Sequence, residues 1–272
     1  MRSQVVHVFI EIGMQTVLFT STIFGPIHSR RLGSSLGVNL MPRDGKVCSF
    51  DCLYCEAGFN AQGPGKSGLP SRSEVRELLE AKLSDMKAKD EPLDVITFSG
   101  NGEPTLHPEF EGVIDDVIEL RDKFFPQVRI SVLSNATMLH SDSVKRALRR
   151  VDNNILKLDS ALTPTMRAID RPGSPSFSSE RVIAQLEEFG SDCIVQTMML
   201  RGSHNGVEID NTLPEEVEAL AAAYRRIRPR EVMLYSIDRK TPEEHLRKVS
   251  RDELEAIAER FRRDGITVQV TG

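Results

Sequence analysis

The sequence Cys48-Ser-Phe-Asp-Cys52-Leu-Tyr-Cys55 places three cysteines within eight residues, in the spacing C-x3-C-x2-C. Thiolates favour soft metal centres such as iron–sulfur clusters, zinc or copper(I). Three thiolates are one ligand short of four, so either another side chain completes the site or one metal corner stays open for a cofactor or substrate. The fourth cysteine, Cys193, lies in an apolar run, and free cysteine is usually buried. We expect Cys193 in the core and a metal centre at residues 48–55.

The composition is typical of a globular protein with a full core, since 39% of the 272 residues are hydrophobic and 28% are charged. The net charge of −5 argues against a wholly cationic surface for nucleic acid, but leaves a local basic face open. Four cysteines, three of them clustered, do not form a disulfide framework. The pattern indicates a reducing compartment, and we expect a cytoplasmic protein.

The N-terminal residues differ from the rest of the chain. Residues 5–24 are the most apolar stretch, but His7, Glu11 and Gln15 interrupt it, so it does not predict a membrane span. We expect residues 1–16 to be an extension, with Met14 as an alternative start, and residues 17–272 to form a single domain. We expect no membrane partner.

Apolar, β-branched runs alternate with amphipathic helical patterns along the chain. We expect strands at residues 37–41, 95–99, 128–133, 155–158, 194–200, 232–237 and 266–270. The expected helices begin at Ser71, which starts a capping-box pattern, and cover residues 109–123, 141–150, 178–189, 214–227 and 251–262. Strands that alternate with helices predict βαβ units and a parallel sheet. About seven strands and six helices predict an α/β protein built as a parallel βα barrel, full or incomplete.

In a parallel barrel the functional groups lie at the C-terminal ends of the strands. Polar or glycine-rich sequence follows several of the expected strands: the cysteine motif, Gly100-Asn-Gly-Glu-Pro104, Ser134-Asn135 and Asp159-Ser160. These loops are therefore the expected location of the site.

The cysteine motif, with Tyr54 before its last cysteine and Gly100-Asn-Gly-Glu-Pro104 after the next strand, resembles the radical S-adenosylmethionine (radical SAM) superfamily. The resemblance covers about residues 17–270 and implies an incomplete barrel of the (β/α)6 type. It also implies a [4Fe–4S] cluster bound by Cys48, Cys52 and Cys55, with S-adenosylmethionine on the open iron. An electron from a flavodoxin- or ferredoxin-like partner would cleave this cofactor to methionine and a 5′-deoxyadenosyl radical, which takes hydrogen from a substrate. Such an enzyme is oxygen-sensitive.

The same resemblance assigns roles at the cofactor. Tyr54 corresponds to an aromatic position near the adenine, and the backbone of Gly100, Asn101, Gly102, Glu103 and Pro104 to the loop that receives the methionine amino group. Asn101 stands where the common motif has glycine. Ser134, Asn135 and Asp159 resemble cofactor-contacting positions after the following strands. Each role has an alternative. The Tyr54 ring could serve only to cover the cysteine loop, and Glu103 could be a surface carboxylate. Ser134, Asn135 and Asp159 could be ordinary turn residues after strands.

Several segments, including Phe24–Pro42 and Asp170-Arg-Pro172, are similar to small radical SAM proteins distantly related to the wybutosine-synthesis tRNA enzymes. Those tRNA enzymes bind a second cluster through upstream cysteines, and no cysteine precedes Cys48 here. A second cluster is therefore not expected, and this difference counts against a tRNA substrate. The similarity itself favours an RNA base or nucleotide as the substrate, which we rank first, with a peptide or protein, as for an activase, second and a small metabolite as a further alternative. Arg30 and Arg31 are candidates for binding phosphate or carboxylate, with a structural ion pair as the alternative. A non-enzymatic alternative is a zinc site made of the three cysteines and either His28 or His107.

Overall fold

An open parallel sheet forms the centre of the protein in the computed structural model, which describes residues 17–29 and 33–271. Its seven parallel strands are, in spatial order, β2 (Gly33–Val38), β3 (Val95–Phe98), β4 (Arg129–Ser134), β5 (Asn153–Lys157), β6 (Ile194–His204), β8 (Glu231–Ser236) and β10 (Val268–Thr271). Among the described residues the two ends of this order do not pair, so the barrel is incomplete. The predicted fold class is confirmed.

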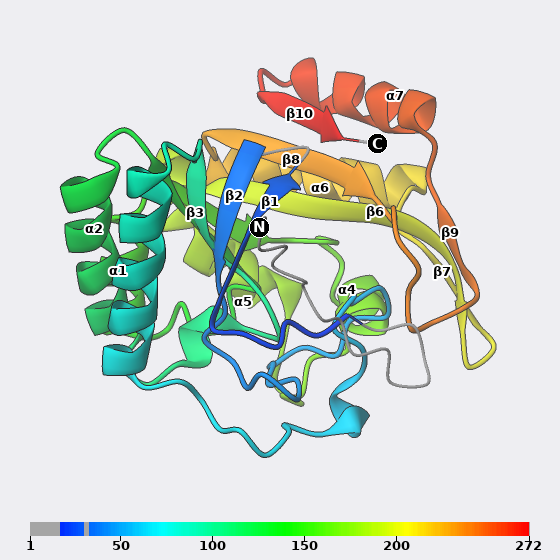
Figure 1. Cartoon of the computed structure of the whole chain (residues 1–272). Helices are drawn as coiled ribbons and strands as arrows, with labels where there is room; N and C mark the ends of the chain where they lie inside the picture. The colour runs from blue at the N-terminus through cyan, green and yellow to red at the C-terminus, as the bar shows by residue number, and fades with distance from the viewer. Residues whose placement is uncertain (1–16, 30–32, 272) are drawn as a thin grey trace.

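The six helices predicted from apolar periodicity are all present: α1 (Arg72–Ala88), α2 (Phe110–Phe124), α3 (Asp142–Leu148), α5 (Ser179–Glu187), α6 (Pro214–Ile227) and α7 (Arg251–Arg262). Ser71 caps α1 by accepting a hydrogen bond from the Glu74 N–H. The reciprocal bond of a capping box is found instead at α7, between Ser250 and Glu253. Figure 1 shows α1 and α2 side by side along one flank and α7 next to β10.

Three elements, β7 (Val207–Asp210), β9 (Leu246–Lys248) and α4 (Thr163–Asp170), were not predicted, and β1 (Ile23–Ser29) only overlaps the β-branched run at residues 16–24 that favours an extended segment. Strand β1 pairs antiparallel with β2, and β7 and β9 pair antiparallel with residues 200–204 of β6. Helix α4 follows β5. Strand β6 continues to His204 because a hairpin through Asn205 and Gly206, both at positive φ, returns the chain as β7. We call β7, β9 and the end of β6 the antiparallel arm, which extends beyond the barrel in Figure 1.

The core lies between the sheet and the helices and contains Cys193, whose side chain is fully buried. The prediction that Cys193 is a core residue is therefore confirmed. Three predictions, the N-terminal extension at residues 1–16, Met14 as a start, and the roles of Arg30 and Arg31, lie outside the described residues. Within the part of the chain that the structure describes, no helix is long and apolar enough to cross a membrane.

Candidate functional site

The cysteine loop and the glycine-rich loop are joined backbone to backbone at the C-terminal ends of β2 and β3. The Val47 N–H donates to the Asn101 carbonyl at 3.0 Å, and the Glu103 N–H donates to the Val47 carbonyl at 3.1 Å. A Cβ atom on Gly102 would lie 1.8 Å from the Val47 carbonyl oxygen, so only glycine permits this approach. The two motifs, which are far apart in the sequence, therefore form one surface.

Glu103 connects this surface to the next strand. Its carboxylate is 2% exposed and accepts hydrogen bonds from the Asn135 N–H at 2.6 Å and from the Thr105 N–H at 3.1 Å. Burial raises the pKa of this carboxyl group even though these donors lower it. Glu103 is not a surface carboxylate, and it holds the loops after β3 and β4 at a fixed separation.

Asn135 contacts the cysteine loop directly. Its side-chain Nδ2 lies 2.9 Å from the Ser49 Oγ and 3.5 Å from the Cys48 Sγ, while its Oδ1 accepts the Thr137 N–H at 3.1 Å. The neighbouring Ser134 hydroxyl accepts the Ala136 N–H at 3.1 Å, which is a local turn bond. Asn135 therefore reaches the first cysteine, whereas the Ser134 hydroxyl bonds within its own turn and to the Glu103 carboxylate.

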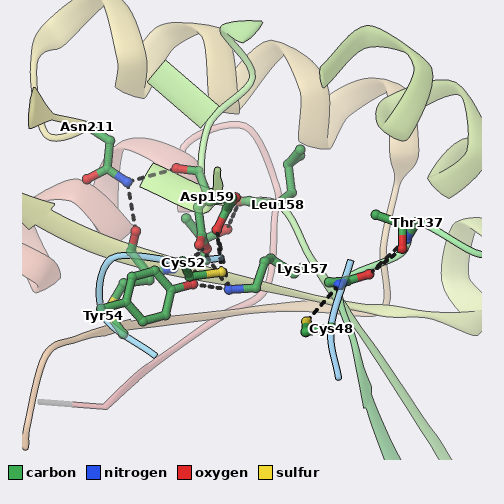
Figure 2. Close-up of polar contacts among 12 residues, drawn as sticks. Cys48, Cys52, Tyr54, Thr137, Lys157, Leu158, Asp159 and Asn211 are labelled. Carbon is green, nitrogen blue, oxygen red and sulfur yellow. Dashed lines mark hydrogen bonds and ion pairs between the residues drawn. The ribbon is translucent and has the colours of Figure 1, made fainter. Parts of the chain in front are cut away.

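A buried charged network surrounds the middle cysteine. Cys52 lies 3.2 Å from Asp170, and the Lys157 ammonium lies 3.7 Å from the same carboxylate and 3.1 Å from that of Asp159. The Tyr54 hydroxyl bonds to both Lys157 and Asp159. Figure 2 shows Tyr54, Lys157 and Asp159 converging beside Cys52.

Lys157 is the only cation of this network, and it faces two carboxylates that are fully buried. Burial opposes its charge, but Asp159 and then the Cys52 and Asp170 groups raise its pKa well above the ordinary value. Burial and the neighbouring Asp159 raise the pKa of Asp170. Sequence reasoning missed Lys157 and Asp170 as site residues. A lysine within the apolar strand Ile155-Leu-Lys-Leu158 was the available signal.

Lys46 places a second buried cation at the cysteine loop. Its side chain is 1% exposed, and its Nζ donates to the Gly58 carbonyl at 2.7 Å and lies 3.6 Å from Asp51. Burial lowers the pKa of Lys46, but the three cysteines of the motif, Cys55 first, together with Asp51 raise it, and the net shift is upward. All three thiols are therefore close enough to interact with this one ammonium group.

The three thiols suit a soft metal group. Cys52 is buried, and Cys48 and Cys55 are half-buried, with burial raising the pKa of Cys48 to about 12 and that of Cys52 well above its ordinary value. Within residues 17–29 and 33–271, no three His, Cys, Asp or Glu side chains gather tightly enough to hold a single metal ion. The donor set, three thiols within range of one cation, fits a multinuclear cluster with cysteine ligands.

The histidines of the zinc alternative are placed differently. Both ring nitrogens of His107 are used, one 2.8 Å from the Pro70 carbonyl and the other accepting the Glu109 N–H at 3.2 Å. His28 is exposed on β1 and lines a cavity described below. His107 therefore has no free nitrogen for a metal.

Asn101 uses its side chain for the N-terminal segment. The Asn101 Oδ1 accepts the Phe19 N–H at 2.8 Å, and its Nδ2 donates to the carbonyls of Phe19 at 2.9 Å and Pro42 at 2.8 Å. The asparagine that replaces the usual glycine thus binds both backbone groups of one residue outside the motif. Its backbone stays in the glycine-rich loop, where contact with the cofactor remains a prediction.

Comparison with known proteins identifies the family. The model of the "Radical SAM superfamily" matches residues 44–205, which is more than half of the chain. A protein from Brachyspira hyodysenteriae described as "GTPase Obg" is 26% identical over 90% of this chain but only 34% of its own length. A "UPF0026 protein" of Helicobacter pylori is 28% identical over 85% of this chain and 71% of its own length.

Solved structures share the fold at low sequence identity. A radical SAM methyltransferase from Sphaerobacter thermophilus superposes with a TM-score of 0.62 at 14% identity, covering 87% of this chain and 65% of that one. SuiB from Streptococcus suis bound to precursor peptide SuiA superposes with a TM-score of 0.61 at 13% identity, covering 87% of this chain and 48% of that one. A structure of TYW1 with a lysine-pyruvate adduct bound superposes with a TM-score of 0.56 at 16% identity, covering 86% of this chain and 75% of that one. With the matched cysteine and glycine-rich loops, these findings show that the chain belongs to the radical SAM superfamily.

Proposed function

We propose that this protein is an enzyme that binds a [4Fe–4S] cluster through Cys48, Cys52 and Cys55 and S-adenosylmethionine beside it, and that its substrate is an RNA base or nucleotide. The observation that carries the proposal is the backbone pairing of the cysteine loop with the glycine-rich loop through Val47 and Gly102. When bound, the two groups supply a carbon-centred radical that takes hydrogen from a substrate.

The residues around the cysteines hold the two loops in register. Glu103 fixes the distance between the β3 and β4 loops, and Asn135 orients Cys48 from the β4 side. Asp159 accepts the Met198 N–H at 2.9 Å, which ties the β5 end to β6. We assign the cofactor to the surface formed by these strand ends, with the backbone of residues 100–104 receiving its methionine part.

Tyr54 lies over the same surface. Its ring is 4.4 Å from the Lys157 ammonium, and its hydroxyl is held by Lys157 and Asp159. This arrangement supports the predicted position of an aromatic ring beside the adenosine. The same buried network keeps water from the middle cysteine, because Cys52 is only 7% exposed.

The test is reductive cleavage without added substrate. Anaerobically reconstituted protein, dithionite and S-adenosylmethionine are expected to yield 5′-deoxyadenosine, and Cys52→Ala is expected to abolish the product. Cys193→Ala is the matched control, since Cys193 is equally buried but packs in the core and bonds to Gly190. Failure of the reconstituted wild type, or full activity of Cys52→Ala, would refute the proposal.

A peptide or protein substrate is the second candidate. It is favoured by the fold shared with SuiB, whose structure holds a precursor peptide. An electron donor of the flavodoxin or ferredoxin type and a cytoplasmic location belong to either version of the proposal.

A further inference from the structure

A cavity of about 230 Å³ lies inside the open barrel, and we call it the lumen cavity. Its floor is apolar: Leu133, Ile155 and Met233, on three different strands, belong to a small hydrophobic cluster separate from the main core. Glu56, which directly follows the last cysteine of the motif, also lines the cavity. The lumen cavity is therefore adjacent to the proposed cluster.

Gln196 brings an unused amide group into this cavity. It lies on β6 two residues from Ile194, a member of the same small cluster, and strand residues two apart share a face. Gln196 is 9% exposed, and within residues 17–29 and 33–271 its side chain has no hydrogen-bond partner. The other polar groups at this level, the hydroxyls of Ser35 and Thr97, bond to each other at 2.8 Å. The Gln196 amide is therefore open to the cavity and is placed to bond a ligand there, since a ligand that left it unpaired would lose a hydrogen bond that water provides.

Two aromatic rings form another wall. Phe19 and Phe24 stack with their centroids 3.8 Å apart and their planes 18° from parallel. Phe24 is held against Gly37, where an added Cβ atom would lie 2.1 Å from the ring, and Phe19 is held by Asn101. Flat aromatic surfaces of this kind stack with nucleobases.

The charged side chains that line the cavity are at its mouth. Glu56 and Arg239 form an ion pair there at 2.5 Å, and both are exposed. Arg239 also lines a second, more open cavity together with Lys240 and Lys248. The path thus runs from an interior lined by apolar and uncharged polar side chains to an exterior with three cationic side chains, accompanied by the carboxylates of Asp238 and Glu244.

We propose that the lumen cavity binds the base of a nucleotide or RNA substrate, with the Gln196 amide paired to the edge of the base and the phosphate near Arg239 and Lys240. This inference rests on the proposed function and names the substrate class of the same site. The geometry favours a base over a peptide side chain because the cavity joins an aromatic wall, an amide and an apolar floor.

Binding is measured by isothermal titration calorimetry on reconstituted protein with saturating S-adenosylmethionine, so that the adenosine site is already filled. The probes are AMP, GMP, CMP and UMP, the four matching nucleosides, and Gly-Gln-Gly and Gly-Lys-Gly tripeptides. At least one nucleotide is expected to bind. Gln196→Met, which keeps the volume and removes the amide, is expected to weaken it at least tenfold, and Arg239→Ala to weaken the nucleotide but not the nucleoside.

Gln269→Met is the matched control, because Gln269 is an exposed strand glutamine on β10. If Gln196→Met fails to fold, as judged by circular dichroism, Gln196→Glu takes its place and is expected to change the order of base preference. No nucleotide binding to the wild type, binding unaffected by Gln196, or Gln196-dependent binding of a tripeptide alone would each overturn the inference. The cleavage test above needs no substrate, so failure of one proposal is distinguishable from failure of the other.

Discussion

Replacing Asn101 by glycine, the residue more usual in this motif, tests how the N-terminal segment is attached. The substitution removes three hydrogen bonds, two to the backbone of Phe19 and one to the Pro42 carbonyl, at 2.8–2.9 Å. Asn101 is fully buried, and a hydrogen bond is worth about 1 kcal/mol net. Phe19 is only half-buried, so water replaces part of the loss. We expect Asn101→Gly to lower the free energy of unfolding by about 2–3 kcal/mol.

Asn101→Gly is expected to loosen the N-terminal segment locally as well as to lower the global stability. Hydrogen exchange measured by mass spectrometry should speed up in the peptide that spans residues 17–29, while exchange in α2 changes only with global stability. Urea denaturation gives the stability change. Asn205→Gly is the control, because Asn205 lies at an exposed hairpin turn with positive φ and should lose almost nothing. Unchanged exchange at residues 17–29 in Asn101→Gly would refute the reasoning, even if the protein were less stable.

Three further predictions concern charge and packing. Lys46→Gln keeps a hydrogen-bond donor for the Gly58 carbonyl but removes a buried cation beside the cysteines. The reduction potential of the cluster, measured by redox titration, should therefore fall by about 60 mV or more. An unchanged potential at full iron content would contradict this. Gly37→Ala should cost about 1–3 kcal/mol in urea denaturation, because the added Cβ displaces the Phe24 ring, and wild-type stability would contradict it. Hydrogen bonds from Arg201 and from Ser250 lower the pKa of Glu253 to about 2, from 4.5. The stability from these contacts is therefore complete above pH 4.5 and lost as the pH falls toward 2. Glu253→Gln should show a shallower loss of Tm over that range, and a slope equal to that of the wild type would contradict this.

Much of the barrel was predictable because its parallel strands are short apolar runs between amphipathic helices. The ranges of α6 and α7 were predicted to the residue. Strands β7 and β9 were missed because their sequences are polar, and they exist only through pairing with the end of β6. The Asn205-Gly206 turn was a local signal for that hairpin that the apolar pattern did not include.

The residues of the site also fall into those that the sequence predicts and those that it does not. Cysteine spacing and the glycine-rich motif are local patterns, so Cys48, Cys52 and Gly102 could be found in the sequence. Lys157 ends β5 and Asp170 ends α4, both distant in sequence from Cys52, and the burial of each depends on the other and on Asp159. A buried ion pair of this kind is decided by tertiary packing, so composition and periodicity do not reveal it.

The continuity of β6 has a practical consequence. One unbroken strand carries Gln196 in the lumen cavity and, eight residues later, forms the arm that ends at His204. The arm turns at Asn205 and Gly206, which both have positive φ, and the next residue, Val207, is 60% exposed and pairs with His204 at the end of β6. A fluorophore attached at position 207 would thus be held by the strand that carries the cavity wall. It would give an optical reading of ligand entry in a protein that contains no tryptophan.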